Sequence, residues 1–267
     1  LEIPNDYIVG IVPGSDTGAI EMAMWNCLGA KPVEILVWDS FGSDWANDIK
    51  SQLKINELSI SKVDYGRLPN LLNKNFTSDI VFNWNGTTAG VCVPDADWID
   101  DKRVGLTICD ATSAAFAMNI DWSKLDVTTF SWQKCLGGEG GHGMIILSPK
   151  AVERINSYNP QWPIPKLFQL KKNGKLNIDI FSGSTINTPS MLCVEDYIDA
   201  LNWSIDIGGL AELIKRSKNN LNIIAEWVSK SHWVDFLSEN FDTVSNTSIC
   251  LKLIDTKIIN QSLEVKN

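Results

Sequence analysis

The stretch with the clearest chemical potential is DVTTFSWQKCLGGEGGHGMIILSP, residues 126–149, in which an apolar, β-branched run ends in Lys134. A glycine-rich turn and a second apolar run follow. We expect Lys134 to be buried at the end of a strand. Burial favours the neutral form of an amine, which can attack a carbonyl group and form a Schiff base. The alternative is a surface lysine that merely closes a strand.

Asp110 ends a second apolar run, VGLTIC, and small residues follow it. A buried carboxylate is costly unless a cation or a hydrogen-bond donor pairs with it. A pyridinium nitrogen is such a partner, and the pairing keeps the ring protonated and therefore able to accept electrons. The alternative is that Asp110 caps a helix opened by the residues DATS.

The turn GSDTG, residues 14–18, lies between a predicted strand and a predicted helix. Its backbone, the hydroxyls of Ser15 and Thr17 and the positive end of the helix would together cradle an anion. It is not a P-loop, because the Lys-Ser/Thr pair of that motif is absent. The alternative is that Asp16 or Thr17 simply caps the helix.

Three further positions carry groups that suit a flat, substituted ring. An exposed indole at Trp45 would stack on it, and Thr87 or Thr88 would offer a hydroxyl to a ring substituent. Packing of the tryptophan and turn chemistry of the threonines are the alternatives. Asn187 or Thr188 is expected to cap a later helix, which leaves either free for a second role.

A mainly parallel sheet would position these groups. Strand-like and helix-like runs alternate over residues 7–150, and the apolar runs are continuous, as in strands buried on both faces. Ligands gather at the carboxyl ends of such strands, where the polar clusters fall. A long helical stretch and a strand at residues 246–254 follow. We expect a large cofactor-binding domain at residues 1–188, and a connecting helix with a partial small domain at residues 189–267.

Composition narrows the function classes. The chain has 267 residues, 44% of them hydrophobic, and a net charge of −9, which argues against nucleic acid and anionic membranes as partners. No apolar run approaches the roughly 20 residues of a membrane helix. Six scattered cysteines without a CxxC pair, and two histidines without ligand spacing, predict reduced thiols in a cytoplasmic protein and no metal site. The chain begins at Leu1 and not at a methionine, enters a strand-like segment within a few residues, and stops just after the first clear strand of its second unit, as expected of the internal part of a longer protein.

Lysine, aspartate, anion cradle and tryptophan together indicate pyridoxal phosphate. The sequence also closely resembles the phosphoserine aminotransferase family, in the class V branch of fold-type I enzymes. The matching segments are GSDTGAIEMAMW, NWNGTTAGVCVP, LTICDATSAA, TFSWQKCLGGEGGHGMIILSPKAVER and TINTPSMLCVEDYIDAL. The resemblance implies an α/β fold with a mainly parallel, seven-stranded-type sheet sandwiched by helices, and a smaller α+β C-terminal domain.

The resemblance also implies roles around the cofactor ring. Lys134 matches the lysine that holds the cofactor as a Schiff base and moves the substrate proton. Asp110 matches the partner of the pyridine nitrogen, and Trp45 matches the stacked aromatic residue. Thr87 matches the contact to the ring hydroxyl, although Thr88 leaves the register open by one residue.

Other matches surround the phosphate group. Gln133, Asp16 and Thr17 match positions that contact it. Asn187 and Thr188 match a pair that reaches the phosphate of the other subunit, which implies a homodimer with shared active sites. His142 lies among the glycines near Lys134, and a structural role is favoured for it over that of a general base.

The implied reaction transfers the amino group of glutamate to 3-phosphohydroxypyruvate, giving O-phosphoserine and 2-oxoglutarate, in serine and possibly pyridoxine biosynthesis. The substrate-binding arginines of the family are not matched. The four arginines, which lie outside the polar clusters, are Arg67, Arg103, Arg154 and Arg216. If the chain ended here, we would expect little or no transaminase activity.

Three alternatives stay open. One is another class V reaction, such as serine–glyoxylate transamination or cysteine desulfuration, although Cys135 is too close to Lys134 to serve as a mobile desulfurase cysteine. Another is a non-catalytic, cofactor-binding fragment. The third is a phosphate-binding α/β domain without the cofactor.

Overall fold

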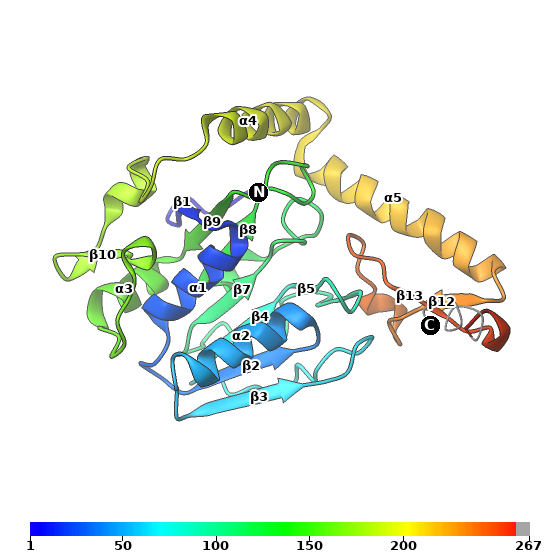
Figure 1. Cartoon of the computed structure of the whole chain (residues 1–267), viewed down its shortest axis with the longest axis horizontal. Coiled ribbons are helices and arrows are strands. Elements are labelled where there is room, and N and C mark those ends of the chain that lie inside the picture. The colour runs from blue at the N-terminus through cyan, green and yellow to red at the C-terminus, as the bar shows by residue number, and fades with distance from the viewer. Residues whose placement is uncertain (260–267) are drawn as a thin grey trace, which may run out of the picture.

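A seven-stranded sheet forms the centre of the computed structural model, which describes residues 1–259 (Figure 1). The strands lie in the order β1-β9-β8-β7-β4-β2-β3. Only β9 runs antiparallel to its neighbours β1 and β8, so the predicted mainly parallel sheet is confirmed. The bounds are β1 (Ile8–Pro13), β2 (Val33–Val37), β3 (Leu58–Lys62), β4 (Asp79–Asn83), β7 (Thr107–Asp110), β8 (Val127–Ser131) and β9 (His142–Leu147).

Both faces of this sheet are buried, as the continuous apolar runs predicted. In β4, Val81 faces one apolar core while Ile80 and Phe82 face the other, because side chains alternate along a strand. The first core lies under three helices, α1 (Ser15–Cys27), α2 (Ser40–Ser51) and α3 (Pro149–Ser157). The second lies largely under the irregular chain of residues 84–125.

The predicted long helical stretch is two helices. α4 (Met191–Asp206) and α5 (Gly209–Lys230) meet at Gly208, whose φ of 116° lies in the left-handed region that ends helices. Figure 1 shows these helices arching over one end of the sheet toward β12 and β13. A third, small apolar core there includes Val228, Phe236 and Val244. The domain boundary at 188/189 stays a prediction, and residues 260–267 of the second unit lie outside the described residues.

The remaining elements are short. Three two-stranded pairs join β5 (Asn85–Gly86) to β6 (Val91–Cys92), β10 (Lys171–Lys172) to β11 (Lys175–Leu176), and β12 (Val234–Phe236) to β13 (Leu251–Leu253). Single 3-10 turns are formed by Trp122–Lys124, Lys166–Phe168, Ile178–Ser182 and Phe241–Thr243. Within residues 1–259, no helix combines the length and apolar character needed to cross a membrane.

Gly143 lets the first turn of α1 lie directly on the sheet. A Cβ atom at this position of β9 would lie 2.2 Å from the carbonyl oxygen of Ser15 and 2.8 Å from the side chain of Ala19. Any larger residue would therefore push α1 away from β9. One of the glycines after Lys134 thus fixes where the turn GSDTG sits above the strand ends.

We expect Gly143→Ala to lower the free energy of unfolding by about 1–3 kcal/mol, the usual cost of overpacking a tight contact. Gly141→Ala is the matched control, because no atom lies within 4 Å of a Cβ placed there. Its effect should stay within about 0.5 kcal/mol. Denaturant unfolding measures both variants, and equal losses would contradict the close-approach role of Gly143.

Candidate functional site

One cleft at the carboxyl edge of the sheet gathers most of the predicted site residues. It opens between the first turn of α1, the start of α2 and the turn after β8, with a cavity volume of about 70 Å³. Of the predicted set, only Asn187 and Thr188 lie outside it. The lining residues are Ser15, Asp16, Thr17, Phe41, Trp45, Thr87, Asp110, Thr112, Ser113, Gln133 and Lys134.

The topology explains this convergence. Asp110 is the last residue of β7, and Lys134 follows the end of the neighbouring strand β8 by three residues. Asp16 and Thr17 lie in the first turn of α1, and Trp45 lies in α2. The carboxyl ends of parallel strands meet at one edge of the sheet, so the side chains that follow them meet there too.

Asp16 and Asp110 form a carboxyl pair at the base of the cleft. Asp16 is 6% exposed, and its Oδ1 has no hydrogen-bond partner. Burial, followed by the adjacent charge of Asp110, raises the pKa of Asp16 well above its ordinary value. The hydroxyls of Thr112 and Thr129 favour the charged form, but more weakly. Burial and the adjacent Asp110 therefore both favour the protonated form of Asp16.

Asp39 adds a third buried carboxyl group to this edge. It follows β2 and caps α2, where its Oδ1 accepts a hydrogen bond from the backbone N–H of Gly42 at 2.8 Å. Burial raises the pKa of Asp39 to about 6, with a further contribution from the charge of Asp110. Within residues 1–259, no lysine or arginine forms an ion pair with Asp16, Asp39 or Asp110. The site therefore has an excess of acidic groups.

The first turn of α1 is open to an anion. Its N-cap is Gly14, with a φ of 84° and no side-chain hydrogen bond, so the alternative that Asp16 or Thr17 caps the helix is wrong. The first backbone bond of the helix runs from Gly18 N–H to the Gly14 carbonyl at 2.9 Å. The preceding amides of the turn are those that a helix leaves for a cap, water or a ligand.

Asp110 closes a turn and not a helix. Its Oδ1 accepts a hydrogen bond from the backbone N–H of Thr112 at 2.9 Å, and residues 112–117 form turns. The alternative that Asp110 caps a helix is therefore wrong, because its side chain stabilises a turn after β7 instead.

Thr87 and Thr88 have different hydrogen-bond partners. The Thr88 hydroxyl accepts a hydrogen bond from the backbone N–H of Ser40 at 3.0 Å and is held at the start of α2. The Thr87 hydroxyl lies 3.0 Å from the Ser113 hydroxyl, and both residues line the cleft. The geometry therefore favours Thr87 for contact with a ring substituent.

Trp45 is buried, whereas an exposed indole was predicted. It is 5% exposed and packs in the first apolar core while one part lines the cleft. Its Nε1 has no hydrogen-bond partner. The position in α2 directs the indole toward the sheet, so it forms a rigid wall of the site.

Lys134 is exposed at the mouth of the cleft, and the prediction of a buried lysine is wrong. β8 ends at Ser131, so Lys134 belongs to the turn beyond the strand. In that turn the backbone N–H of Gly137 donates to the Lys134 carbonyl at 3.0 Å. The Ser131 hydroxyl donates to the side-chain oxygen of Gln133, which lies beside Lys134 on the rim.

Asn187 and Thr188 are exposed and lie just before α4. In the sequence they are distant from the residues that line the cleft. The Asn187 amide donates to the Thr188 carbonyl at 3.2 Å. Ser190, not either of these residues, caps α4, because its hydroxyl accepts the hydrogen bond from the backbone N–H of Cys193. Both side chains therefore remain available to another molecule.

The four arginines are paired away from the cleft. Two of these pairs lie in the interior of the chain and two on its surface. The pairs are Arg154–Asp79 at 2.7 Å, Arg103–Asp126 at 2.9 Å, Arg67–Glu239 at 2.8 Å and Arg216–Glu212 at 3.4 Å.

Sequence reasoning missed Ser113 and Phe41, which line the cleft, and Asp39, whose pKa is raised by burial and by the charge of Asp110. Asp39 has the same sequence signal as Asp110, since both are acidic residues at the carboxyl end of a buried strand: Asp110 ends β7, and Asp39 follows β2 by two residues. Ser113 and Phe41 were inside recognised polar clusters but were not singled out. A systematic reading of every residue after a parallel strand would have found all three.

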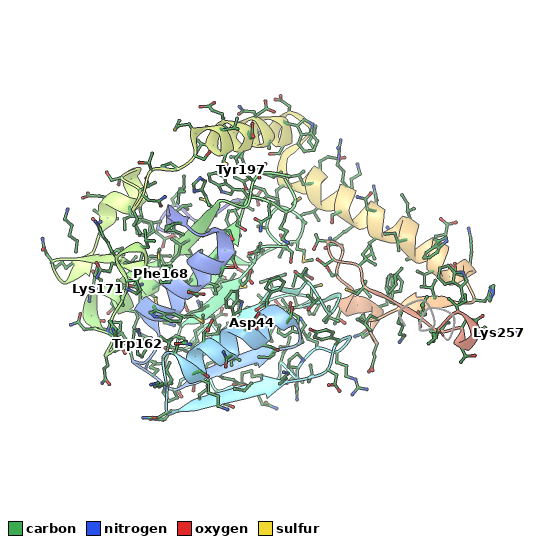
Figure 2. All side chains as sticks on the ribbon, in the orientation of Figure 1. Asp44, Trp162, Phe168, Lys171, Tyr197 and Lys257 are labelled. Atoms are coloured by element: carbon green, nitrogen blue, oxygen red, sulfur yellow. The ribbon has the colours of Figure 1, made fainter. Side chains whose placement is uncertain are left out.

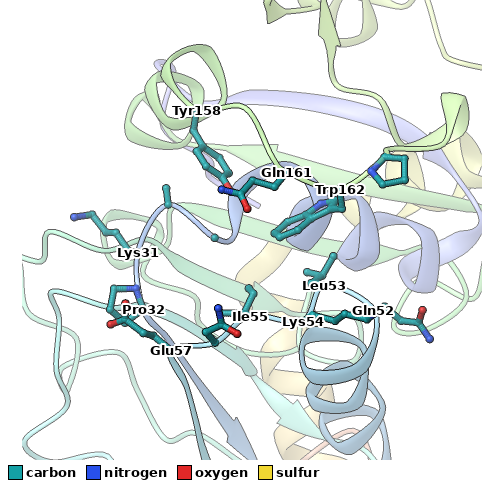
Figure 3. Close-up of a pocket in the computed structure, with 14 residues that line it drawn as sticks. Lys31, Pro32, Gln52, Leu53, Lys54, Ile55, Glu57, Tyr158, Gln161 and Trp162 are labelled. Carbon is teal, nitrogen blue, oxygen red and sulfur yellow. The ribbon is translucent and has the colours of Figure 1, made fainter.

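A larger cavity of about 620 Å³ lies elsewhere on the chain (Figure 3). Its walls come from residues 29–32, 52–57 and 158–163, before β2 and after the ends of α2 and α3. It contains none of the predicted site residues. The smaller cleft is the candidate site because the unpaired carboxyl group and the open helix turn are both there.

Comparisons with known proteins identify the family of the chain. No family model matches the chain. The chain is 56% identical to the phosphoserine aminotransferases of Methanosarcina mazei and Methanosarcina barkeri over 253 residues, which are 95% of this chain and 68% of each relative.

Solved structures show the same fold. A phosphoserine aminotransferase from Cytophaga hutchinsonii matches with a TM-score of 0.82 at 20% identity, covering 99% of this chain and 73% of that one. A phosphoserine aminotransferase from Trichomonas vaginalis, solved with bound pyridoxal phosphate, matches with a TM-score of 0.72 at 15% identity, covering 92% and 66%. On the identity and coverage of the Methanosarcina relatives, the chain belongs to the phosphoserine aminotransferase family of pyridoxal-phosphate-dependent transaminases.

Proposed function

We propose that this chain is the cofactor-binding body of a phosphoserine aminotransferase. The reaction moves the amino group of glutamate to 3-phosphohydroxypyruvate and yields O-phosphoserine and 2-oxoglutarate. The observation that carries the proposal is the meeting of Lys134, the Asp16–Asp110 pair and the open turn of α1 in one cleft.

The cleft fits pyridoxal phosphate. The unpaired, buried Oδ1 of Asp16 and the adjacent Asp110 suit a protonated ring nitrogen, which is both a cation and a hydrogen-bond donor. The open amides of α1, the Thr17 hydroxyl and the Gln133 side chain suit a phosphate group. The Trp45 wall and the Thr87 hydroxyl suit the ring face and a ring substituent.

Each residue then has a defined task. When bound, pyridoxal phosphate supplies an electron sink for the carbon that loses its proton. Lys134, at the mouth of the cleft, binds the cofactor and transfers the substrate proton as a general base and acid. Asp110, at the end of β7, would pair with the ring nitrogen. Trp45, fixed by the core, restricts the tilt of the ring.

Asp16 suits the phosphate through its backbone and not through its side chain. Its carboxyl group is directed at Asp110, and a carboxylate would repel a phosphate. The backbone N–H of the same residue belongs to the open turn of α1. We therefore propose that Asp16 binds the cofactor through its backbone, and that its side chain forms part of the acidic floor of the cleft.

A homodimer with shared sites is part of the proposal. α4 presents large apolar side chains to solvent, among them Met191, Leu192 and Ile205, each more than 60% exposed. Several large apolar side chains exposed on one helix favour an interaction site. Asn187 and Thr188 precede this surface and lie outside the cleft of their own chain, as residues that serve a partner's phosphate would.

A cofactor-binding chain without turnover is the second candidate. One observation favours it: all four arginines are paired away from the cleft. Substrate carboxylate and phosphate groups need cations, which arginine supplies best.

We also propose a cytoplasmic location and a role in pyridoxine biosynthesis, on the basis of the family resemblance.

Reduction with borohydride should attach the cofactor to Lys134. We expect mass mapping of reduced, cofactor-loaded protein to place the label on this residue in the wild type and in Lys172→Ala, whose exposed lysine lies on β10. Lys134→Ala should carry no label. Adding glutamate before reduction should diminish the label if the chain transaminates, and leave it intact in a chain without turnover. A label on another lysine would refute the site.

Asp16→Asn should stabilise the cofactor-free protein at alkaline pH. Because the folded-state pKa of Asp16 is raised, the folded wild type loses stability as pH rises above about 4 toward that pKa, whereas asparagine does not titrate. We expect the variant to exceed the wild type by at least about 1 kcal/mol at pH 8, with a smaller difference at pH 5. Denaturant unfolding measures this. The exposed Asp44→Asn should show no such gain, and equal behaviour of the two variants would contradict the carboxyl pair.

Leu192→Glu should break the dimer. A charge within the apolar surface of α4 would be buried without a partner on association. We expect sedimentation to show mainly monomer for this variant and dimer for the wild type. Leu72→Glu is the control, because Leu72 is as exposed as Leu192, at 70% against 71%, but lies in a loop remote from α4 in the sequence. If both variants remained dimeric, α4 would not be the interface.

A further inference from the structure

His142 occupies a junction outside the cleft. It is the first residue of β9, where it pairs with Pro13 at the end of β1 and follows the glycine-rich turn from Lys134. Its side chain is buried, with 6% exposed. None of the tasks assigned above uses it, so its burial calls for a reason of its own.

The imidazole accepts a hydrogen bond from the start of α4. The backbone N–H of Ser190 donates to Nε2 of His142 at 3.0 Å. Ser190 is the N-cap of α4 and follows Asn187 and Thr188 closely. Only an unprotonated ring nitrogen can accept this bond, so the contact requires the neutral imidazole.

Aromatic contacts extend the same attachment. The His142 ring lies 5.1 Å from the ring of Trp132, which stacks on Tyr197 of α4 at 4.6 Å and 9°. Figure 2 shows Tyr197 reaching from α4 toward the sheet. Trp132 directly precedes Gln133 and Lys134 in the chain. The start of α4 and the turn bearing the site lysine are thus held to each other through His142 and Trp132.

We propose that His142 is a positioning residue whose neutral imidazole fixes the start of α4 and so sets where Asn187 and Thr188 meet a second subunit. The inference rests on the proposed function, because only the proposed dimer gives those two residues a partner site. It adds a residue that controls the shared site without touching cofactor or substrate.

Protonation would undo this attachment. Burial lowers the pKa of His142 below its ordinary value of 6.5, and no charged group contributes to the shift. A protonated ring would place a donor against the donor N–H of Ser190. The stabilisation is therefore complete above pH 6.5 and is lost as pH falls below it. The titratable groups on the surrounding elements are Asp16, Glu21 and Cys27 of α1, Lys134, Cys135 and Glu139 of the preceding turn, and Cys193, Glu195, Asp196, Tyr197, Asp199 and Asp206 of α4.

His142→Gln separates the hydrogen bond from its titration. A glutamine oxygen reaches the position of Nε2 and accepts the same bond at every pH, whereas His142→Leu removes the acceptor and keeps an apolar volume. We expect the dimer dissociation constant of the wild type to rise about tenfold between pH 8 and pH 5.5. The glutamine variant should stay constant, and the leucine variant should be weak at both values.

Hydrogen exchange of the Ser190 amide provides the reading that does not depend on the dimer. At pH 5.5 we expect this amide to be better protected in His142→Gln than in the wild type. His232→Gln, which changes the other, exposed histidine, is the control and should behave as the wild type does. Equal protection of the Ser190 amide in the wild type and in His142→Gln would overturn the inference, even in a protein that binds the cofactor. Loss of cofactor binding with the Ser190 response intact would overturn the proposed function and leave the hydrogen-bond role of His142 standing.

Discussion

The adjacent carboxyl groups of Asp16 and Asp110 determine which ligand the site can accept. Both are buried, and within residues 1–259 neither forms an ion pair with a lysine or arginine. Such an arrangement is tolerable only when one carboxyl group is neutral or when a positive partner arrives. The protein carries a net charge of −9, so its overall field does not relieve this repulsion. The ring nitrogen of pyridoxal phosphate meets the requirement, which links the electrostatics of the fold to the chemistry of the family.

The scaffold places this pair by close packing. Gly143 allows α1 to rest on β9, and Gly14 leaves the first turn of that helix uncapped. The same strand begins at His142, which holds the start of α4. Thus β9 contacts both the turn proposed to bind the phosphate and the start of α4, where the subunit contact is proposed. Asp110 ends β7 and Lys134 lies in the turn that follows the neighbouring strand β8. The two residues come together because parallel strands end at the same edge of the sheet.

Much of the site could be predicted because strand ends are visible in the sequence. Asp110 and Thr87 follow apolar runs whose length and composition mark buried strands. The exposure of Trp45 and Lys134 could not be predicted in the same way. It depends on which side of α2 faces the sheet, and on β8 ending at Ser131 and not at the lysine. The break at Gly208 coincides with a Gly-Gly pair, but the sequence pattern is helical on both sides of it. Hydrogen bonds such as Ser190 to His142 join segments 48 residues apart, and no local pattern encodes them.

The protonation state of the bound ring nitrogen tests the central claim most directly. Nuclear magnetic resonance of protein loaded with cofactor carrying nitrogen-15 in the ring reports whether that nitrogen holds a proton. We predict a protonated nitrogen at pH 8 in the wild type and a neutral one in Asp110→Asn. A neutral nitrogen in the wild type would contradict the account, because the carboxyl groups of Asp16 and Asp110 would then have no positive partner.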